Sequence, residues 1–253
     1  MDEGILGALD NGAARRILGH LEARSKLYVA VFSVGFIVGF PAAEEIIEWL
    51  LDSRGFVPDG VEVIILQPME VILLQLRISA QIAFGLTIIA LIVDLAWTGS
   101  SSVPDSLVSA ARGMGSFRVM VVIATVIVLG GLGLAYAHTI LIPFLLEYLA
   151  EDSAASGLQS TWQLQSWVGF VTGLYFSSVV GFQVPVMVVV LLRAGVVDRG
   201  FIVDNRGVIW FFALFMGALI SPPDPVSLFL VGGPMLILLE VALLYEGLTS
   251  RGG

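Results

Sequence analysis

The residues that could carry chemistry are polar side chains placed inside long apolar runs. Gln183 and Pro185 stand together in GFQVPVMVVVLL, Arg77 lies in the run that follows Pro68, and Glu240 closes the run LVGGPMLILLE. Hydrocarbon satisfies neither an amide nor a charge. Each of these side chains therefore needs a partner, either within this chain or in another molecule.

Gln183 is predicted near the middle of its run, about 15 Å of helix away from Arg193. Pro185 cannot donate a hydrogen bond to the carbonyl of Gly181, so we expect a kink and a free acceptor there. The Gln183 amide could bond that carbonyl or a neighbouring helix of the chain. It could equally dock a transmembrane helix of a partner, where such a bond contributes about 0.6 to 2 kcal/mol.

Arg77 is a cation inside an apolar run and requires a counter-charge. Glu70 lies on the same helix face two turns earlier and could supply it, and a neighbouring helix is the other source. Pro68 and Glu70 also suit the ordinary start of a helix, where proline and an acid are favoured.

A second helix start is predicted at SPPDP, residues 221–225. Pro222 and Pro223 end one helix, and Asp224 is expected to cap the next helix, which begins at Pro225. A tight hairpin between two helices explains this motif without any further role.

The residues that catalysis usually needs are missing. The chain has no cysteine, its two histidines lie far apart, and it contains no HExxH, GxSxG or Walker motif. We therefore expect no enzyme activity, no metal site and no cofactor, and no nucleic-acid partner.

Composition indicates a membrane protein. Hydrophobic residues make up 57% of the chain and charged residues 13%, and the mean hydropathy is +0.96. We expect an all-α integral membrane protein with one domain over residues 1–253 and no cleaved leader. Its six transmembrane helices are predicted at residues 27–41, 74–97, 118–147, 165–193, 208–220 and 225–245. The fifth is short, because it gives only about 20 Å of helix.

Charge orients these spans. With the N-terminus inside, all Lys and Arg residues except Arg54 and Arg77 fall on the cytoplasmic side. The positive-inside rule then predicts a plasma-membrane protein with both termini cytoplasmic. In the first outer loop, PAAEEIIEWLLDSRG predicts a separate amphipathic helix on the outer surface. The net charge of −9 with Lys26 as the only lysine indicates a high-salt environment.

The motifs, in order, resemble those of the TatC family of twin-arginine translocase proteins. GHLEARSKL is similar to the family's HLxELRxRL with one residue fewer, and QPMEVILLQLR to its proline-led second helix. GLAYAHTILIP resembles its third-helix pattern, GFQVPV its F-[EQ]-x-P, and SPPDPVSLFLVGGP its TPPD…P signature. The resemblance extends over nearly the whole chain.

The resemblance implies a six-span protein with short fifth and sixth helices. Such proteins bind Arg-Arg signal peptides at the cytoplasmic face, dock TatA- and TatB-type single-span partners, associate with other TatC copies, and use the proton gradient. It assigns signal-peptide binding to Glu22 and Arg24. The family's loop glutamate is absent here, and Asp105, the only acid in that loop, is the candidate to bind the signal peptide in its place. Without such a replacement, the chain would bind signals weakly or act as the non-receptor half of a paired or fused TatC.

The resemblance also assigns partner docking to Gln183, with Pro185 beside it, and we add Glu240 as a further docking candidate. Two alternatives remain. One is an assembly-only TatC homologue that binds no signal peptide. The other is a small secondary transporter with Gln183, Arg77 and Glu240 around a midplane site.

Overall fold

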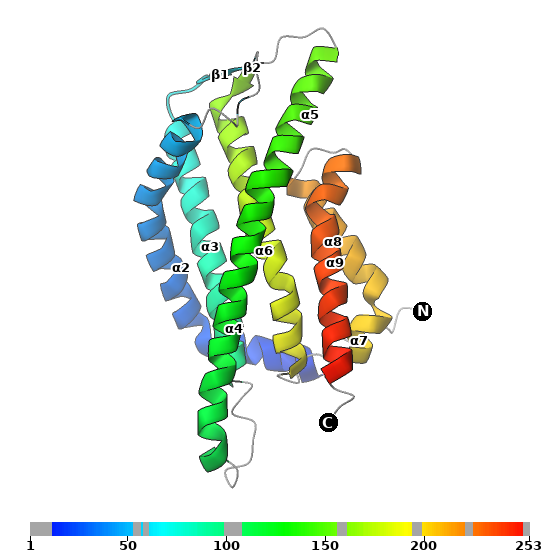
Figure 1. The fold of residues 1–253 in the computed structure, drawn as a ribbon. Coiled ribbons are helices and arrows are strands. Elements are labelled where there is room, and N and C mark those ends of the chain that lie inside the picture. The colour runs from blue at the N-terminus through cyan, green and yellow to red at the C-terminus, as the bar shows by residue number, and fades with distance from the viewer. Residues whose placement is uncertain are drawn as a thin grey trace.

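The chain folds into a bundle of long helices that stand side by side (Figure 1). The computed structural model describes residues 12–52, 57, 61–98, 108–155, 161–193, 199–220 and 225–249. In chain order the elements are α2 (Gly12–Asp52), β1 (Glu62–Ile64), α3 (Glu70–Thr98), α4 (Val108–Tyr136), the π-helix η3 (Ala137–Leu141), α5 (Ile142–Ala155), β2 (Thr161–Gln163), α6 (Leu164–Arg193), α7 (Arg199–Asp204), α8 (Arg206–Ile220) and α9 (Pro225–Thr249).

Four helices of the described chain are long and apolar enough to cross a membrane. They are Leu21–Asp52, Glu70–Trp97, Val119–Glu151 and Leu164–Arg193. A mostly helical chain with membrane-capable helices is therefore confirmed. The remaining apolar helices are shorter. The apolar part of α9 covers Gly232–Leu244, and α8 has 15 residues, which give about 22 Å of helix.

Two helix boundaries differ from the sequence prediction. The predicted amphipathic helix after Pro41 is not separate, because α2 continues through Pro41 to Asp52. Ile47 and Leu50 on this extension are buried in the core, and that packing favours one continuous helix over a break at the proline. The sixth helix was predicted at residues 225–245, and α9 continues to Thr249, although its apolar part covers only Gly232–Leu244.

A small parallel sheet, which was not predicted from the sequence, caps one end of the bundle. β1 pairs with β2 in the register Glu62↔Thr161, Val63↔Trp162 and Ile64↔Gln163. The strands lie beside the end of α2, at the end of the bundle from which α5 projects (Figure 1). The pairing places the start of α3 beside the start of α6.

Glycines allow the helices to approach closely. Gly35 and Gly39 of α2 face Ala83 and Ser79 of α3, where an added Cβ would lie 3.1 and 3.2 Å from their Cα atoms. Such small-residue contacts are the usual way in which membrane helices pack. The α2–α3 pair is therefore a close, backbone-to-backbone contact.

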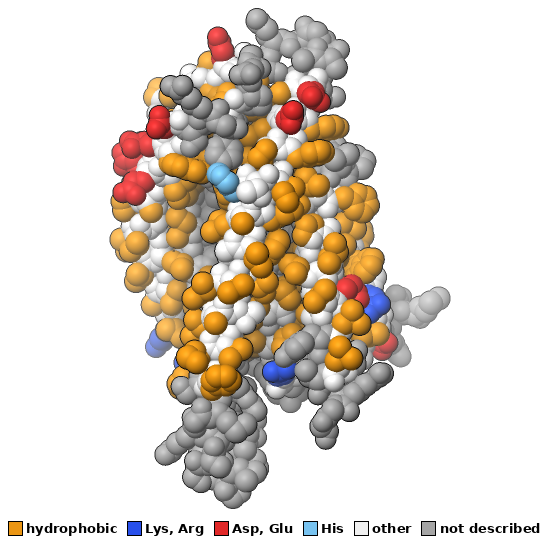
Figure 2. Space-filling model, in the orientation of Figure 1, with side chains coloured by type: hydrophobic (Ala, Val, Ile, Leu, Met, Phe, Trp, Pro, Cys, Tyr) orange, Lys and Arg blue, Asp and Glu red, His pale blue; other side chains and the backbone are white. Residues whose placement is uncertain are grey.

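Charged side chains separate to the two ends of the molecule. Most acidic groups in view gather at the end formed by the last turns of α2 and by α5, and Lys and Arg gather at the opposite end, where further acidic groups lie beside a basic one (Figure 2). A broad apolar band lies between them, as expected for a surface that contacts lipid. The first turns of α2 and the last turn of α9 lie at the basic end (Figure 1).

Candidate functional site

A long apolar groove follows α3, and we call it the α3 groove. Its first part, of about 670 Å³, lies between α2, α3, α4 and α6 and reaches Trp49, His138 and Tyr175. Its second part, of about 880 Å³, lies between α2 and α3 and reaches Arg24, Asp94 and Trp97. Leu86 and Ile89 line both parts, so the groove is continuous along the helix.

The end of the groove that lies toward the sheet carries a polar contact between helices. His138 Nδ1 lies 2.8 Å from Tyr175 Oη, and the ring of Trp49 lies 6.2 Å from the imidazole. His138 stands in η3, where the wider π turn changes the direction of the side chains that follow. In the sequence, His138 lies within GLAYAHTILIP, the segment that resembles the family's third-helix pattern.

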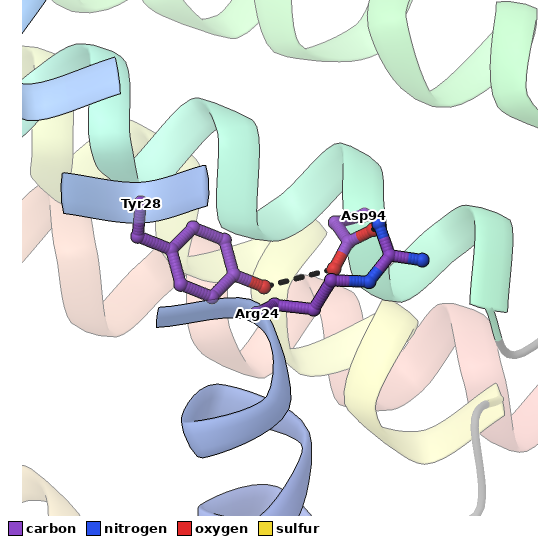
Figure 3. Close-up of polar contacts among 3 residues, drawn as sticks. All are labelled: Arg24, Tyr28 and Asp94. Atoms are coloured by element: carbon purple, nitrogen blue, oxygen red, sulfur yellow. Dashed lines mark hydrogen bonds and ion pairs between the residues drawn. The ribbon is translucent and has the colours of Figure 1, made fainter. Parts of the chain in front are cut away.

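The basic end of the groove carries a cluster of two charged residues, Arg24 and Asp94, and the tyrosine Tyr28 (Figure 3). Arg24 Nη1 lies 3.3 Å from Asp94 Oδ1, and the Tyr28 hydroxyl donates a 2.9 Å hydrogen bond to Asp94 Oδ2. Glu22, two residues before Arg24, is exposed. The structure therefore brings Arg24 together with Asp94, a residue that was not predicted from the sequence to belong to the site.

Gln183 is almost fully buried at the contact of α6 with α4. Its Nε2 donates to the carbonyl of Val126 at 3.2 Å, and within the described ranges its Oε1 has no hydrogen-bond partner. The amide thus bonds a neighbouring helix, which was one of the two interpretations. Pro185 lies inside α6, which continues to Arg193. Partner docking at Gln183 stays a prediction.

Replacing Gln183 with leucine is expected to change the unfolding free energy by less than about 1 kcal/mol. The lost interhelical bond averages about 0.6 kcal/mol in membrane proteins, and removing the unpaired buried oxygen offsets part of that loss. Chemical unfolding of the purified protein in detergent measures the difference. A loss above about 2 kcal/mol would contradict this account and mean that Oε1 has an essential partner.

Glu240 has partners inside the chain. Its Oε2 lies 3.2 Å from Arg206 Nη2, and the indole of Trp210 donates to its Oε1 at 3.3 Å. These contacts join α9 to α8 and neutralise an acid that would be costly alone in an apolar run. A docking role for Glu240 remains a prediction.

Glu70 is fully buried at the start of α3. Its Oε1 accepts hydrogen bonds from the amides of Leu66 and Gln67 and from the side chain of Gln163 in β2. Pro68 lies in the turn just before the helix. The carboxylate therefore links β2 of the sheet to the start of α3.

Glu70 does not supply the counter-charge that Arg77 was expected to need. Among the residues described, no ion pair joins the two side chains. The guanidinium instead lies against Gly169 of α6, where an added methyl group would collide with it. The reason is local, because the carboxylate instead accepts hydrogen bonds from the amides of Leu66 and Gln67, just before the helix.

Four predicted residues fall outside the described part of the chain. They are Asp105, Pro222, Pro223 and Asp224. The helix that Asp224 was expected to cap does begin at Pro225. Within the described ranges, no group of three or more His, Asp and Glu side chains is placed to hold a metal ion.

Known proteins resemble this chain in sequence. The family model of the Sec-independent protein translocase protein (TatC) matches residues 16–234. TatC of Halothiobacillus neapolitanus is 26% identical over 244 residues, which cover 95% of this chain and 64% of that protein. TatC of Escherichia coli K12 is 30% identical over 115 residues, which cover 46% of this chain and 44% of that protein. The chain thus spans less than two thirds of the length of either relative.

The fold has a solved counterpart. A crystal structure described as the twin arginine translocase receptor TatC matches with a TM-score of 0.67 at 22% identity, over 92% of this chain and 99% of that one. At this identity the comparison speaks to the fold alone. The family model, however, extends from α2 to α9, so the chain belongs to the TatC family of Sec-independent protein translocase proteins.

Proposed function

We propose that this chain is the membrane scaffold of a twin-arginine protein translocase and receives Arg-Arg signal peptides. The α3 groove carries the proposal. Apart from Gln81, its α3 lining is apolar from Ile78 to Ile89, and it reaches Asp94, a distance of about 24 Å along the helix from Ile78. A signal peptide has a cationic start followed by 7 to about 15 apolar residues. Its charge and its length both complement the groove.

The proposed topology has six spans in one domain, with both termini in the cytoplasm. The separation of acidic and basic side chains to opposite ends supports this orientation by the positive-inside rule. The Tyr136 hydroxyl donates to the carbonyl of Leu230 at 2.7 Å, and this bond between α4 and α9 supports a single domain. The shortness of α8 requires a thinner bilayer or shielding by neighbouring helices.

The proposed partners are TatA- and TatB-type single-span proteins, other copies of TatC and the signal peptide itself. The unpaired Oε1 of Gln183 leaves one acceptor for an incoming helix if α4 and α6 separate. Glu240 would need to exchange Arg206 for a partner's donor. The work of transport would come from the proton gradient, with no covalent step. The acidic, lysine-poor composition supports operation at high salt.

Photocrosslinking at two valines of α2 tests the signal-peptide site. Val34 lines the α3 groove, whereas Val29 does not, and the two are similarly exposed at 61% and 64%. A photoreactive residue at position 34 should crosslink an Arg-Arg signal peptide in native membranes, and the same probe at position 29 should not. A Lys-Lys peptide should give a weaker crosslink at position 34.

Comparison of the probes at positions 34 and 29 distinguishes a signal-peptide receptor from an assembly-only homologue. Equal crosslinks at the two positions would show contact without a defined groove site and would contradict the proposal. No crosslink at either position, while another TatC copy in the same membranes is labelled, would favour the assembly-only homologue.

A further inference from the structure

Asp94 is an acid that the fold has fixed in position at the mouth of an apolar groove. Its side chain is 10% exposed, and a hydrogen bond from the buried Tyr28 hydroxyl orients its carboxylate. Both residues lie on the closely packed α2–α3 pair. The groove beside Asp94 is lined by apolar side chains such as Val34 and Val93. A carboxylate held in this way is suited to receive a cation that precedes an apolar segment.

The aromatic ring of Trp97 adds to this site. Trp97 lines the same part of the groove, three residues beyond Asp94 on α3, and is 62% exposed. An exposed indole face attracts a guanidinium more strongly than most side chains do. Asp94 and Trp97 together therefore favour a planar cation.

Arg24 fills this position in the structure, although loosely. Its Nη1 lies 3.3 Å from Asp94 Oδ1, and its side chain remains 47% exposed. Charge-assisted hydrogen bonds of this kind are usually about 2.7–2.9 Å long, and a half-exposed pair contributes little to stability. An arginine of a ligand could therefore replace Arg24 with little loss, because it offers the same guanidinium (Figure 3).

We propose that Asp94 is the carboxylate that receives a guanidinium of the signal peptide, and that Arg24 holds this place until the peptide displaces it. This inference rests on the proposed function and deepens it. It gives the chain an acid for the twin arginines other than Glu22 and Asp105. The family resemblance assigned Arg24 to signal-peptide binding. In this proposal Arg24 instead competes with the peptide for Asp94.

Peptide binding to the full-length protein in lipid nanodiscs tests the exchange. A fluorescent Arg-Arg signal peptide and its Lys-Lys counterpart are titrated, and Kd is measured by anisotropy. Asp94→Asn should weaken Arg-Arg binding by about tenfold or more and reduce the preference over Lys-Lys. Arg24→Gln should tighten Arg-Arg binding several-fold, because the competitor is gone. Asp204→Asn, the same change at an exposed acid of α7, should leave both constants unchanged.

Whether Arg24→Gln tightens or weakens peptide binding distinguishes exchange of Arg24 for the peptide from a purely structural role of Arg24. If Arg24 only stabilised the fold, Arg24→Gln would weaken binding, and that result would overturn the proposal even if Asp94→Asn folded poorly. Gel filtration and thermal unfolding establish folding for each variant. A wild-type chain with no Arg-Arg preference would refute the proposed function. A wild-type preference that Asp94→Asn preserves would refute only the role of Asp94.

Discussion

Replacing Glu70 with alanine is expected to lower the unfolding temperature by about 5 °C or more. Glu70 is fully buried, and its Oε1 accepts from the amides of Leu66 and Gln67 at 3.0 and 2.8 Å and from Gln163 Nε2 at 2.8 Å. Alanine would leave all three donors without their acceptor, and such losses are costly where water is scarce. Thermal unfolding in detergent, followed by circular dichroism, measures the shift.

Two further variants test whether the lower unfolding temperature is specific to the buried carboxylate of Glu70. Glu62 lies in β1 of the same cap but is exposed, so Glu62→Ala should shift the unfolding temperature by no more than about 1 °C. Glu70→Gln keeps a side-chain oxygen as acceptor and should fall between the two. If Glu70→Ala and Glu62→Ala behaved alike, the contact between the sheet and the start of α3 would not depend on this carboxylate.

Glu70 also shows why one of the two counter-charges considered for Arg77 does not form. Its position two turns before Arg77 places both on one helix face, but ion pairs on a helix usually join residues three or four apart, so this spacing does not by itself bring the two charges together. The amides of Leu66 and Gln67, just before α3, lie within hydrogen-bond distance of the carboxylate, whereas among the described residues no ion pair joins it to Arg77. Spacing along a helix therefore predicted which residues share a face but not which donor binds the acid.

The helical architecture was predictable because hydropathy and length set it directly. The sheet was not, because EVI at 62–64 and TWQ at 161–163 are too short to give a strand pattern. They pair only because α3 and α6 bring their starting points together. The continuation of α2 past Pro41 could not be predicted for a similar reason, because it depends on core contacts of Ile47 and Leu50.

Asp94 could have been found from the sequence, and its partners could not. It is an acid in the apolar run LIVDLAW. A charge there is as costly as that of Glu240 in its own apolar run and likewise needs a partner. Arg24 and Tyr28 lie far away along the chain and become its partners only through the packing of α2 on α3. The same holds for His138 and Tyr175, which η3 and α6 bring together.

Replacing Gly133 with alanine is expected to destabilise the α4–α6 contact by about 1–3 kcal/mol. A Cβ at this position would lie 2.8 Å from the carbonyl oxygen of Ser178 and 3.2 Å from the Cα of Val179. These are backbone atoms of α6, so a side-chain rotation cannot relieve the collision. The two helices would have to separate, and every contact along them would weaken. Chemical unfolding in detergent measures the loss.

Gly131 provides a matched control on the same helix. Among the described residues, a Cβ at Gly131 meets no atom within 4 Å, and alanine favours a helix over glycine by about 0.5–1 kcal/mol. Gly131→Ala should therefore stabilise the chain slightly, so that two identical changes, two residues apart, have opposite signs. If both were stabilising, the α4–α6 contact would be able to open without cost. The Gln183 bond to Val126 would then be an easily broken contact, and a partner helix could reach the amide by separating the same two helices.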